Sequence, residues 1–384
     1  MNIYDVYSFF PIAPIRGQGA YVYDQEGNKY LDFYGGHAVI SIGHSHPHYV
    51  KMISEQIQKI GFYSNSIENP LQLELANKLE KTAGISGYDI FYINSGAEAN
   101  DNALKLASFH NGRTKIIALE NSFHGRTSAA INVTHTGRKH QAPINHGLSP
   151  EYIHYQDIDA ILSSINTGTA AAIIIEAIQG VGGLDSIGAD ALKAIRAACT
   201  ATDTIMILDE VQCGYGRSGN FFAYQIADIR PDIITTAKGM GNGFPIGSVL
   251  IDSKKIPPAK GRLGTTYGGN HLACAAGIAV LDVIANEELL QNAQHIGLKL
   301  QQVLENTPGV KGVKGRGLML GAEFDFAVAP LRKNMVLEHG LFTGSSSNPN
   351  LLRILPPLNI NEEHLSEFEE KLHAAITTQL SHTS

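Results

Sequence analysis

Two charged side chains stand where apolar runs end, and together they could do covalent chemistry. Lys238 closes the run 232–237, and Asp209 closes the run 204–208. An amine at the end of a buried strand has a lowered pKa, because desolvation disfavours its charged form, and a neutral amine is a nucleophile. A buried carboxylate needs a cationic partner, such as a protonated pyridine nitrogen. Taken singly, each residue also fits a structural role, Lys238 as a side chain reaching solvent and Asp209 in an ion pair with Arg or Lys.

A third feature is a helix start that could hold an anion. The segment Asn94-Ser95-Gly96-Ala97-Glu98 follows an apolar run, and apolar residues at helical spacing come after it. Free backbone N–H groups and the helix dipole attract an anion there, and Ser95 adds a hydroxyl, although the same pattern alone is an ordinary helix cap. In combination, an anion site, a strand-end Asp and a strand-end Lys are what a pyridoxal phosphate (PLP) enzyme needs.

The elements that must position these residues follow an α/β pattern. Short β-branched runs alternate with amphipathic or Ala-rich stretches, which predicts parallel strands joined by crossover helices. Nearly continuous apolar strands suit a sheet covered on both faces, and ligands bind at the carboxyl ends of such strands. The predicted strands are 90–94, 115–119, 171–176, 204–209, 232–237 and 248–251.

The two ends of the chain predict a second, smaller domain. Residues 21–32 have the pattern of a hairpin with Gly27-Asn28 at its turn. A long helix, glycine-punctuated strands near 315–324 and a helical tail from Glu362 follow residue 270. We therefore expect a large PLP-binding domain over residues 51–270. Residues 1–50 and 271–384 are expected to form one small domain together.

Composition narrows the class of protein. The chain has 384 residues, 43% of them hydrophobic, and a net charge of −7 without any basic stripe, which argues against nucleic acid as a partner. Its three cysteines, Cys199, Cys213 and Cys274, are odd in number and widely spaced, so we expect neither a disulfide framework nor a zinc pair. No export signal or membrane-length apolar run occurs, and a cytoplasmic location is expected.

Five strings in order carry a resemblance to a known family: NSGAEAN, FHGRT, LDEVQCGYGRSG, PDIITTAKGMGNGFPIG and TTYGGN. Together they closely resemble the class III aminotransferases of fold type I, most of all the acetylornithine aminotransferase branch, over nearly the whole chain. The resemblance implies PLP as cofactor and a central, mostly parallel sheet covered by helices. It also implies a small α+β domain from both chain ends and a homodimer with shared active sites.

The resemblance also implies a role for each matching residue. Lys238 resembles the lysine that binds the cofactor covalently and later carries a proton between substrate and cofactor. Asp209 resembles the residue that keeps the pyridine nitrogen protonated. The other implied cofactor contacts are Ser95, Gly96 and Ala97 at the phosphate, Thr266 at the phosphate from the neighbouring subunit, Gln212 at the ring hydroxyl, and Val211 and Phe123 on the two ring faces.

Arginines are expected to recognise the substrates, because a guanidinium binds a carboxylate in a bidentate way. Arg126 resembles the family residue that binds the substrate α-carboxylate, and Arg353 the one that binds the α-carboxylate of glutamate or 2-oxoglutarate. His37 stands where ornithine aminotransferases carry Tyr, which favours an acylated ornithine, although it could be a packed histidine. The implied reaction transfers an amino group between N-acetylornithine and 2-oxoglutarate in arginine synthesis, giving N-acetylglutamate semialdehyde and glutamate.

One departure from the family pattern concerns the substrate. Relatives commonly read Gln-Gly-Glu where this chain has Gln179-Gly180-Val181, and that glutamate can pair with the arginine matched here by Arg353. Val181 cannot, which leaves Arg353 available to a carboxylate. N-succinylornithine is therefore an alternative substrate, followed by ornithine and 4-aminobutyrate.

Three further interpretations compete with an aminotransferase. The segment 214–219 fits G-x-G-x-x-G, typical of NAD-binding oxidoreductases, but an aromatic run follows it, and Lys238 stands where a ribose-binding acid is wanted. His44, His46 and His48 could suggest a metal site, although no Cys or acidic residue is beside them and a loop with a helix start fits better. A non-catalytic binding protein is the third.

Overall fold

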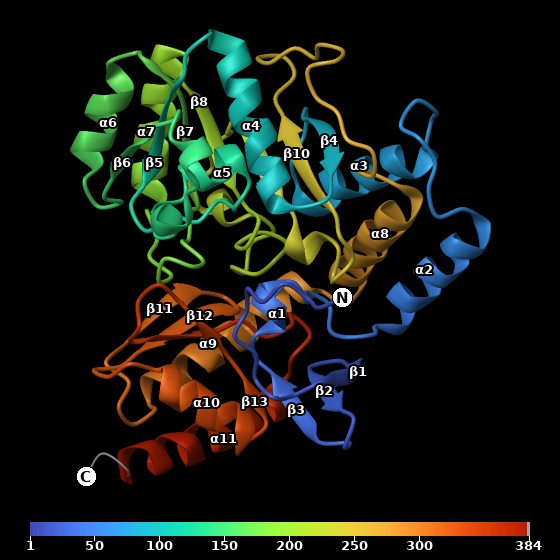
Figure 1. Ribbon diagram of the computed structural model, residues 1–384, viewed down its shortest axis with the longest axis vertical. Coiled ribbons are helices and arrows are strands. Elements are labelled where there is room, and N and C mark those ends of the chain that lie inside the picture. Colours follow the sequence, from blue (N-terminus) through green and yellow to red (C-terminus); the bar gives the residue numbers. More distant parts are fainter. Residues whose placement is uncertain (382–384) are drawn as a thin grey trace.

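A seven-stranded sheet forms the upper half of the molecule in Figure 1. The computed structural model describes residues 1–381. In the order β4-β10-β9-β8-β7-β5-β6, β10 is antiparallel to both its neighbours, and the pairs from β9 to β6 are parallel. The strands are β4 (Asp89–Ile93), β5 (Lys115–Leu119), β6 (Glu151–Ile153), β7 (Ala170–Ile175), β8 (Ile205–Asp209), β9 (Ile233–Thr236) and β10 (Gly247–Ile251).

The sheet is buried on both faces, as its continuous apolar strands predict. Alternate residues of β7 and β8 belong to two separate hydrophobic clusters, with Ile174 and Ile207 in one and Ile173 and Leu208 in the other. Helix α4 (Gly96–Asn111) covers the first face. The second face lies against a larger set of helices: α3 (Pro70–Ala83), α6 (Ile158–Asn166), α7 (Ala189–Thr202) and α8 (His271–Asn286).

The six predicted strands are confirmed, with ends shifted by no more than two residues. The seventh, β6, was not predicted, because three residues are too few to show an alternating pattern. β6 is paired only with β5, at the edge of the sheet. A mostly parallel α/β sheet is therefore the framework on which the candidate residues stand.

Both ends of the chain contribute to the lower half of the molecule (Figure 1). The predicted hairpin is present, and its second strand pairs in parallel with a short strand from near residue 341, which ties the two chain ends together. One sheet has the order β1-β2-β3-β13, with β1 (Pro14–Gln18), β2 (Tyr21–Asp24), β3 (Lys29–Asp32) and β13 (Leu341–Phe342). The other has the order β11-β12-β15-β14, with β11 (Gly312–Arg316), β12 (Met319–Glu323), β15 (Leu351–Ile354) and β14 (Gly344–Ser345).

Helices complete this half. Phe33 stacks on Phe368 with ring centroids 4.4 Å apart, so residues from both chain ends share one core. The domain boundaries at residues 50 and 270 stay a prediction. The helices of this half are α9 (Leu289–Glu305), α10 (Ala329–Leu337) and α11 (Glu362–Ser381). Helix α2 (Pro47–Lys59) packs on α8 instead. Within residues 1–381, no helix has the length and apolar character needed to cross a membrane.

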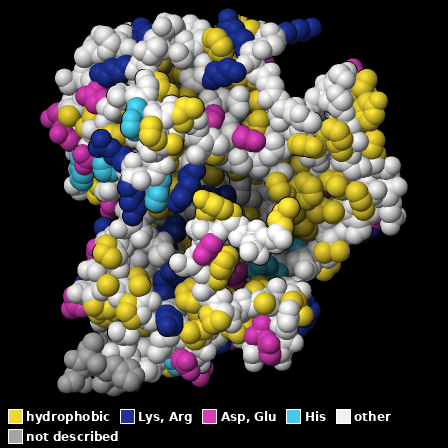
Figure 2. Space-filling model, viewed as in Figure 1, with side chains coloured by type: hydrophobic (Ala, Val, Ile, Leu, Met, Phe, Trp, Pro, Cys, Tyr) yellow, Lys and Arg dark blue, Asp and Glu magenta, His cyan; other side chains and the backbone are white. Residues whose placement is uncertain are grey.

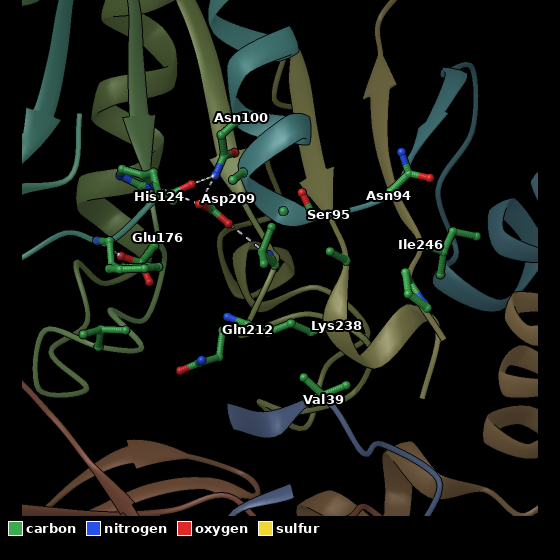
Figure 3. A pocket seen from close by; sticks show the side chains of 18 of the residues that line it. Val39, Asn94, Ser95, Asn100, His124, Glu176, Asp209, Gln212, Lys238 and Ile246 are labelled. Atoms are coloured by element: carbon green, nitrogen blue, oxygen red, sulfur yellow. Dashed lines mark hydrogen bonds and ion pairs between the residues drawn. The ribbon is translucent and has the colours of Figure 1, made fainter. Parts of the chain in front are cut away.

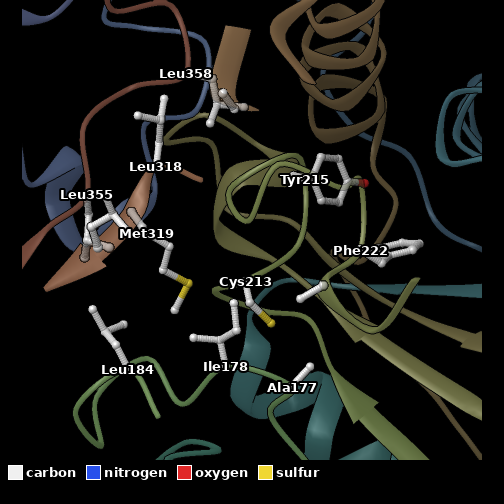
Figure 4. Close-up of a cluster of buried hydrophobic side chains, with 14 of the residues drawn as sticks. Ala177, Ile178, Leu184, Cys213, Tyr215, Phe222, Leu318, Met319, Leu355 and Leu358 are labelled. Carbon is white, nitrogen blue, oxygen red and sulfur yellow. The ribbon is translucent and has the colours of Figure 1, made fainter. Parts of the chain in front are cut away.

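An apolar cluster connects the two halves (Figure 4). Ile178 and Leu184 follow β7, Cys213 follows β8, and all three lie in one core with Met319 and Leu355 of the lower half. Each of these side chains is no more than 4% exposed. The loops at the carboxyl edge of the large sheet are therefore fixed against the small sheet rather than free.

The short element α1 (Gly35–Ala38) is a left-handed turn. Its four residues have φ values of 54°, 53°, 69° and 62°. Two glycines adopt this conformation at little cost, but His37 and Ala38 are held there against a penalty of about 1–2 kcal/mol each. Strain of this kind tends to be kept where a backbone must meet a ligand, and Val39, the next residue, lines the pocket described below.

Candidate active site

A pocket of about 310 Å³ lies at the carboxyl ends of β8 and β9, beside the N-terminus of α4 (Figure 3). Ligands of open α/β sheets bind at this edge. It brings together Lys238, Asp209, Ser95, Gly96, Ala97, Phe123, Val211 and Gln212, all predicted from the sequence. The remaining lining residues are Val39, Asn94, Asn100, His124, Gly125, Glu176, Val181, Ala237, Gly243, Phe244, Pro245 and Ile246.

Asp209 is 3% exposed and is held by three donors. His124 Nδ1 and Asn100 Nδ2 each lie 2.7 Å from its Oδ2, and the backbone N–H of Val211 donates to Oδ1 at 3.0 Å. Asn100 is itself fixed, because Thr235 donates to its side-chain oxygen. The partner of this carboxylate within the chain is thus a histidine rather than an Arg or Lys, and its position is rigid.

Lys238 lies in the short helix η4 (Lys238–Met240), directly after β9, with φ at 45°. Burial lowers the pKa of its amine, while the carboxylates of Asp209 and Glu176 act in the opposite direction. Along residues 1–381, the amine has no hydrogen bond or ion pair. A buried amine with a lowered pKa and no partner is poised as a nucleophile and as a proton carrier.

Glu176 follows β7 and also lines the pocket. Its two oxygens accept hydrogen bonds from the N–H groups of Phe123, at 2.8 Å, and Gly180, at 2.9 Å. Burial raises its pKa, opposed by His124 and reinforced by Asp209. The carboxyl therefore fixes the backbone on which Phe123 stands.

The N-terminus of α4 has the geometry of an anion site. Ser95 is the cap, its hydroxyl accepting from the N–H of Glu98 at 3.3 Å. The N–H groups of Gly96 and Ala97 belong to the first turn, where a helix offers no internal acceptor. A Cβ on Gly96 would lie 2.5 Å from Val211 Cγ1, so only glycine fits between the helix and Val211. The predicted cap is confirmed.

Arg353 lies behind the pocket and is only 2% exposed. Its Nη1 donates to the carbonyl of Gly180 at 2.8 Å and to Gln212 Oε1 at 3.0 Å, and its Nε donates to the carbonyl of Ser345. The Gln212 side chain therefore connects this arginine to the pocket, which it lines. Val181, next to Gly180, lines the pocket as well and offers no carboxylate.

Four predicted residues do not line the pocket: Arg353, which lies behind it, and Arg126, Thr266 and His37. Arg126 and Thr266 are exposed, Arg126 just beyond the pocket residue Gly125. His37 stands in the left-handed turn, with its Nε2 2.9 Å from the Tyr34 hydroxyl. Burial and the charges of Arg353, Lys238 and Arg332 lower the pKa of His37 to about 4, so its ring is neutral at neutral pH.

Sequence reasoning missed Asn100, His124 and Glu176 as site residues. The first two stand inside the quoted strings NSGAEAN and FHGRT, where no role was assigned to them. Asn100 lies among the buried apolar positions of α4, and a polar residue at such a position could have marked it as a site residue. His124 gives no such local signal, because its partner lies 85 residues away.

The glycine-rich segment and the three clustered histidines form neither a dinucleotide fingerprint nor a shared ligand set. Turns and the short helix η3 (Ala223–Ala227), not an α-helix, follow the segment 214–219. Each histidine meets a different carboxylate: His44 pairs with Asp32, His46 with Glu287 and His48 with Asp282.

Comparison with known proteins gives the family. The model of the family "Aminotransferase class-III" matches residues 4–376. The chain belongs to the class III aminotransferases. The aminotransferase is 40% identical over 375 residues to acetylornithine aminotransferase of Caldanaerobacter subterraneus subsp. tengcongensis, covering 94% of each chain.

Two solved structures show the same fold. Acetylornithine aminotransferase from Elizabethkingia anophelis superimposes with a TM-score of 0.82 at 30% identity, covering 97% of this chain and 95% of the other. Ornithine aminotransferase from Toxoplasma gondii, which has PLP at partial occupancy in its active site, gives 0.88 at 27% identity, covering 97% and 92%. The predicted family and fold class are therefore confirmed.

Proposed function

We propose that this aminotransferase uses PLP to transfer an amino group between N-acetylornithine and 2-oxoglutarate, giving N-acetylglutamate semialdehyde and glutamate. The observation that carries the proposal is that one pocket holds both the Lys238 amine, which has no partner among residues 1–381, and the fixed Asp209 carboxylate. The names of the most similar relatives support the choice of substrate and a place in arginine synthesis.

The pocket fits each polar group of PLP. Gly96 and Ala97 offer free N–H groups to a phosphate, with Ser95 beside them. Asp209 would hold the pyridine nitrogen, and Gln212 the ring hydroxyl. Val211 and Phe123 supply apolar contact for the ring, and Lys238 supplies the amine for its aldehyde.

The chain's own groups account for the proton movements of transamination. PLP, when bound, withdraws electrons from the substrate carbon that loses a proton. Asp209 keeps the nitrogen of the ring charged, since His124 and Asn100 hold its carboxylate in place. Lys238 Nζ takes the proton from the substrate carbon and returns it, because its lowered pKa makes a neutral amine accessible.

Arginines bind the carboxylates of the two substrates. Arg126, exposed beside the pocket, would bind the α-carboxylate of acetylornithine, and Arg353 that of glutamate or 2-oxoglutarate. Arg353 is buried and donates to Gln212, which lines the pocket, and this contact supports a role for the arginine in binding the substrate there. His37, neutral in its left-handed turn, would contact the acylated end of the substrate.

We further propose a homodimer that acts in the cytoplasm. The first ten residues expose Tyr4, Val6, Tyr7 and Phe9, an apolar surface of the kind that a second subunit covers. Thr266 is exposed on its own subunit, which suits a residue that completes the phosphate site of a neighbour. The three cysteines are free and buried, as suits a reducing compartment.

Spectroscopy of the holoenzyme tests the cofactor. The purified protein should have the visible absorbance of bound PLP, and borohydride reduction or Lys238→Ala should remove it. Lys254→Ala, which removes an exposed amine after β10, should leave the band unchanged. A Lys238→Ala protein with an unchanged band would refute the assignment.

A half-reaction screen tests the substrate. The holoenzyme is mixed with acetylornithine, ornithine or 4-aminobutyrate, and the loss of the visible band is followed. We expect the fastest loss with acetylornithine. A clear preference for 4-aminobutyrate would refute the proposed substrate and leave the cofactor assignment intact.

A further inference from the structure

The backbone that carries Lys238 has an uncommon conformation. Residues 238–244, called the lysine turn here, begin with Lys238 at a φ of 45°, and Asn242 has a φ of 47°. The turn closes by hydrogen bonds from the N–H of Gly241 to the carbonyl of Lys238 and from the N–H of Phe244 to the carbonyl of Gly241. Lysine is disfavoured at a positive φ, and such a conformation persists only where the surrounding structure fixes it.

Asn242 binds a distant segment of the chain with both ends of its amide group. Its Oδ1 accepts from the N–H groups of Ser41, at 2.8 Å, and Ile42, at 3.1 Å, and its Nδ2 donates to the carbonyl of Gly43 at 2.9 Å. Asn242 is 5% exposed, and Ser41 and Ile42 are buried. Because buried backbone groups need partners, this one side chain fixes the position of the segment 41–43 relative to the lysine turn.

The N-terminal segment in turn donates hydrogen bonds to the lysine turn. Ser41 Oγ donates to the carbonyl of Gly239 at 2.8 Å, and the Tyr49 hydroxyl donates to that of Gly241 at 2.6 Å. The carbonyl of Ser41 accepts from the N–H of Leu358 at 2.7 Å. The two halves of the molecule meet at a hollow in its surface (Figure 2), and these bonds join the lysine turn to the lower half.

Both partners of this contact are next to the pocket. Gly243 and Phe244 of the lysine turn line it, and Val39 lines it from the N-terminal segment. In Figure 3, Val39 lies below Lys238. Asn242 stands outside the lining, directly before Gly243, and connects two walls of the pocket from behind.

We propose that Asn242 is a positioning residue for the amino-group transfer: it holds the lysine turn against the segment 41–43, so that Lys238 Nζ meets the substrate carbon in a productive geometry. Ser41 acts in the same way through the carbonyl of Gly239. This inference rests on the proposed function, because there Lys238 carries the proton. A reacting group misplaced by about 1 Å costs rate on the order of a hundredfold, so kcat rather than KM should respond.

Half-reaction kinetics of the holoenzyme with acetylornithine test the inference. Asn242→Gly removes the amide and keeps a residue that adopts a positive φ, so its effect reports the hydrogen bonds. We expect the rate at saturating substrate to fall about tenfold to a hundredfold, with the half-saturating concentration within about twofold. Asn242→Asp keeps the oxygen acceptor and tolerates a positive φ, and its rate should lie between those of the wild type and Asn242→Gly.

Asn111 provides a matched control at the other end of α4 from the pocket. Its Nδ2 donates to the carbonyls of Ala171 and Asp203, each at 3.0 Å, and its Oδ1 accepts from the N–H of Arg113 at 3.2 Å. Asn111→Gly therefore also removes hydrogen bonds between an asparagine side chain and the backbone. It should lower the free energy of unfolding and leave the half-reaction unchanged.

The pH titration of the bound cofactor's visible spectrum gives a readout that does not depend on turnover. Burial lowers the pKa of the Lys238 amine, and the carboxylates of Asp209 and Glu176 act in the opposite direction. Asn242 is uncharged, so its loss shifts the titration only by moving Lys238 relative to these groups. The midpoint should therefore shift in Asn242→Gly and stay unchanged in Asn111→Gly.

An unchanged titration in Asn242→Gly would overturn the inference, as would equal losses of rate in Asn242→Gly and Asn111→Gly. A rise in the half-saturating concentration at an unchanged rate would overturn it as well, because Asn242 would then act in substrate binding. If Asn242→Gly does not fold, Ser41→Ala decides: its rate should fall about threefold to tenfold, and an unchanged rate would overturn the inference. A Lys238→Ala protein that keeps the visible band would refute the proposed function instead.

Discussion

The two sides of the pocket differ in whether a charged side chain has a polar partner of matching charge within the chain. At the carboxyl edge of the large sheet, the Asp209 carboxylate is matched within the chain by His124, Asn100 and a backbone N–H. On the side of the small sheets, the hydrogen bonds that Arg353 makes within residues 1–381 all go to neutral acceptors. The carboxylate of the first side thus has its partner within the chain, whereas the arginine of the second side makes no ion pair among the described residues.

This difference corresponds to two roles, catalysis of the reaction and recognition of the substrate. A reacting group must be held rigidly, because misplacement of a cofactor ring costs rate directly. A specificity site gains from unpaired charges, because a substrate that lacks the matching group leaves them buried and unsatisfied. Lys238 has features of both sides, with a fixed backbone and an amine free of partners in the described residues.

The largest expected effect comes from breaking the matched side. Asp209→Ala removes the carboxylate that keeps the cofactor nitrogen charged. The nitrogen is then a buried cation without a partner, which costs about 3–5 kcal/mol of interaction free energy. We expect kcat to fall by a factor on the order of a hundred to several thousand in single-turnover measurements. Asp159→Ala, at an exposed position in α6, serves as the control. Activity within tenfold of the wild type would show that Asp209 is structural.

A smaller effect should follow from loosening the same carboxylate. In His124→Gln the hydrogen bond from Nδ1 to Asp209 is lost, and we expect kcat to fall about tenfold to a hundredfold. His124 acts as a positioning residue, so the pH titration of the bound cofactor's visible spectrum should also shift. A fall in kcat with an unchanged titration would indicate a folding defect instead.

Adding a carboxylate next to Arg353 should give this arginine a partner within the chain, as Asp209 already has in His124. In Val181→Glu the new side chain can pair with Arg353, whose Nη1 already reaches the neighbouring carbonyl of Gly180. We expect KM for 2-oxoglutarate to rise about tenfold, since the carboxylate of the substrate must displace an internal one. Val181→Gln is the uncharged control. An equal rise in both variants would point to crowding of the pocket rather than charge.

The smallest effect concerns His37 and pH. Its pKa is lowered from 6.5 to about 4 in the folded protein by burial and by the charges of Arg353, Lys238 and Arg332. Between these values the unfolded chain binds the proton more readily, so His37 contributes stability above pH 6.5 that is lost as pH falls toward 4.

Titration of the His37 ring by NMR and urea unfolding at several pH values check this prediction. The ring should titrate near pH 4 in the wild type and at a higher pH in Arg353→Gln, which removes one nearby charge. His37→Asn, whose side chain tolerates the positive φ, should flatten the loss of stability between pH 6.5 and 4. If the His37 ring of the wild type titrated near pH 6.5, the charges of Arg353, Lys238 and Arg332 would not act on it as the structure indicates.

The sequence by itself was enough to identify Lys238, Asp209 and the Ser95 cap at the carboxyl edge of the large sheet. The ends of the six predicted strands and the Ser95 cap depend on local patterns, namely β-branched runs and a capping residue, so both could be predicted. Lys238 and Asp209 were identified because a charge directly after an apolar run is visible in the sequence. The quoted strings gave the family, and the comparison confirmed it.

Only the tertiary structure decided what these groups meet. Asp209 is joined to residues 85 and 109 positions away, and no local pattern encodes such a pairing. The acceptors of Arg353 gave no local signal either, because the carbonyls of Gly180 and Ser345 and the side chain of Gln212 reach it from other parts of the chain. Charge balance is a property of the folded surroundings, whereas strand and cap signals are properties of neighbouring residues.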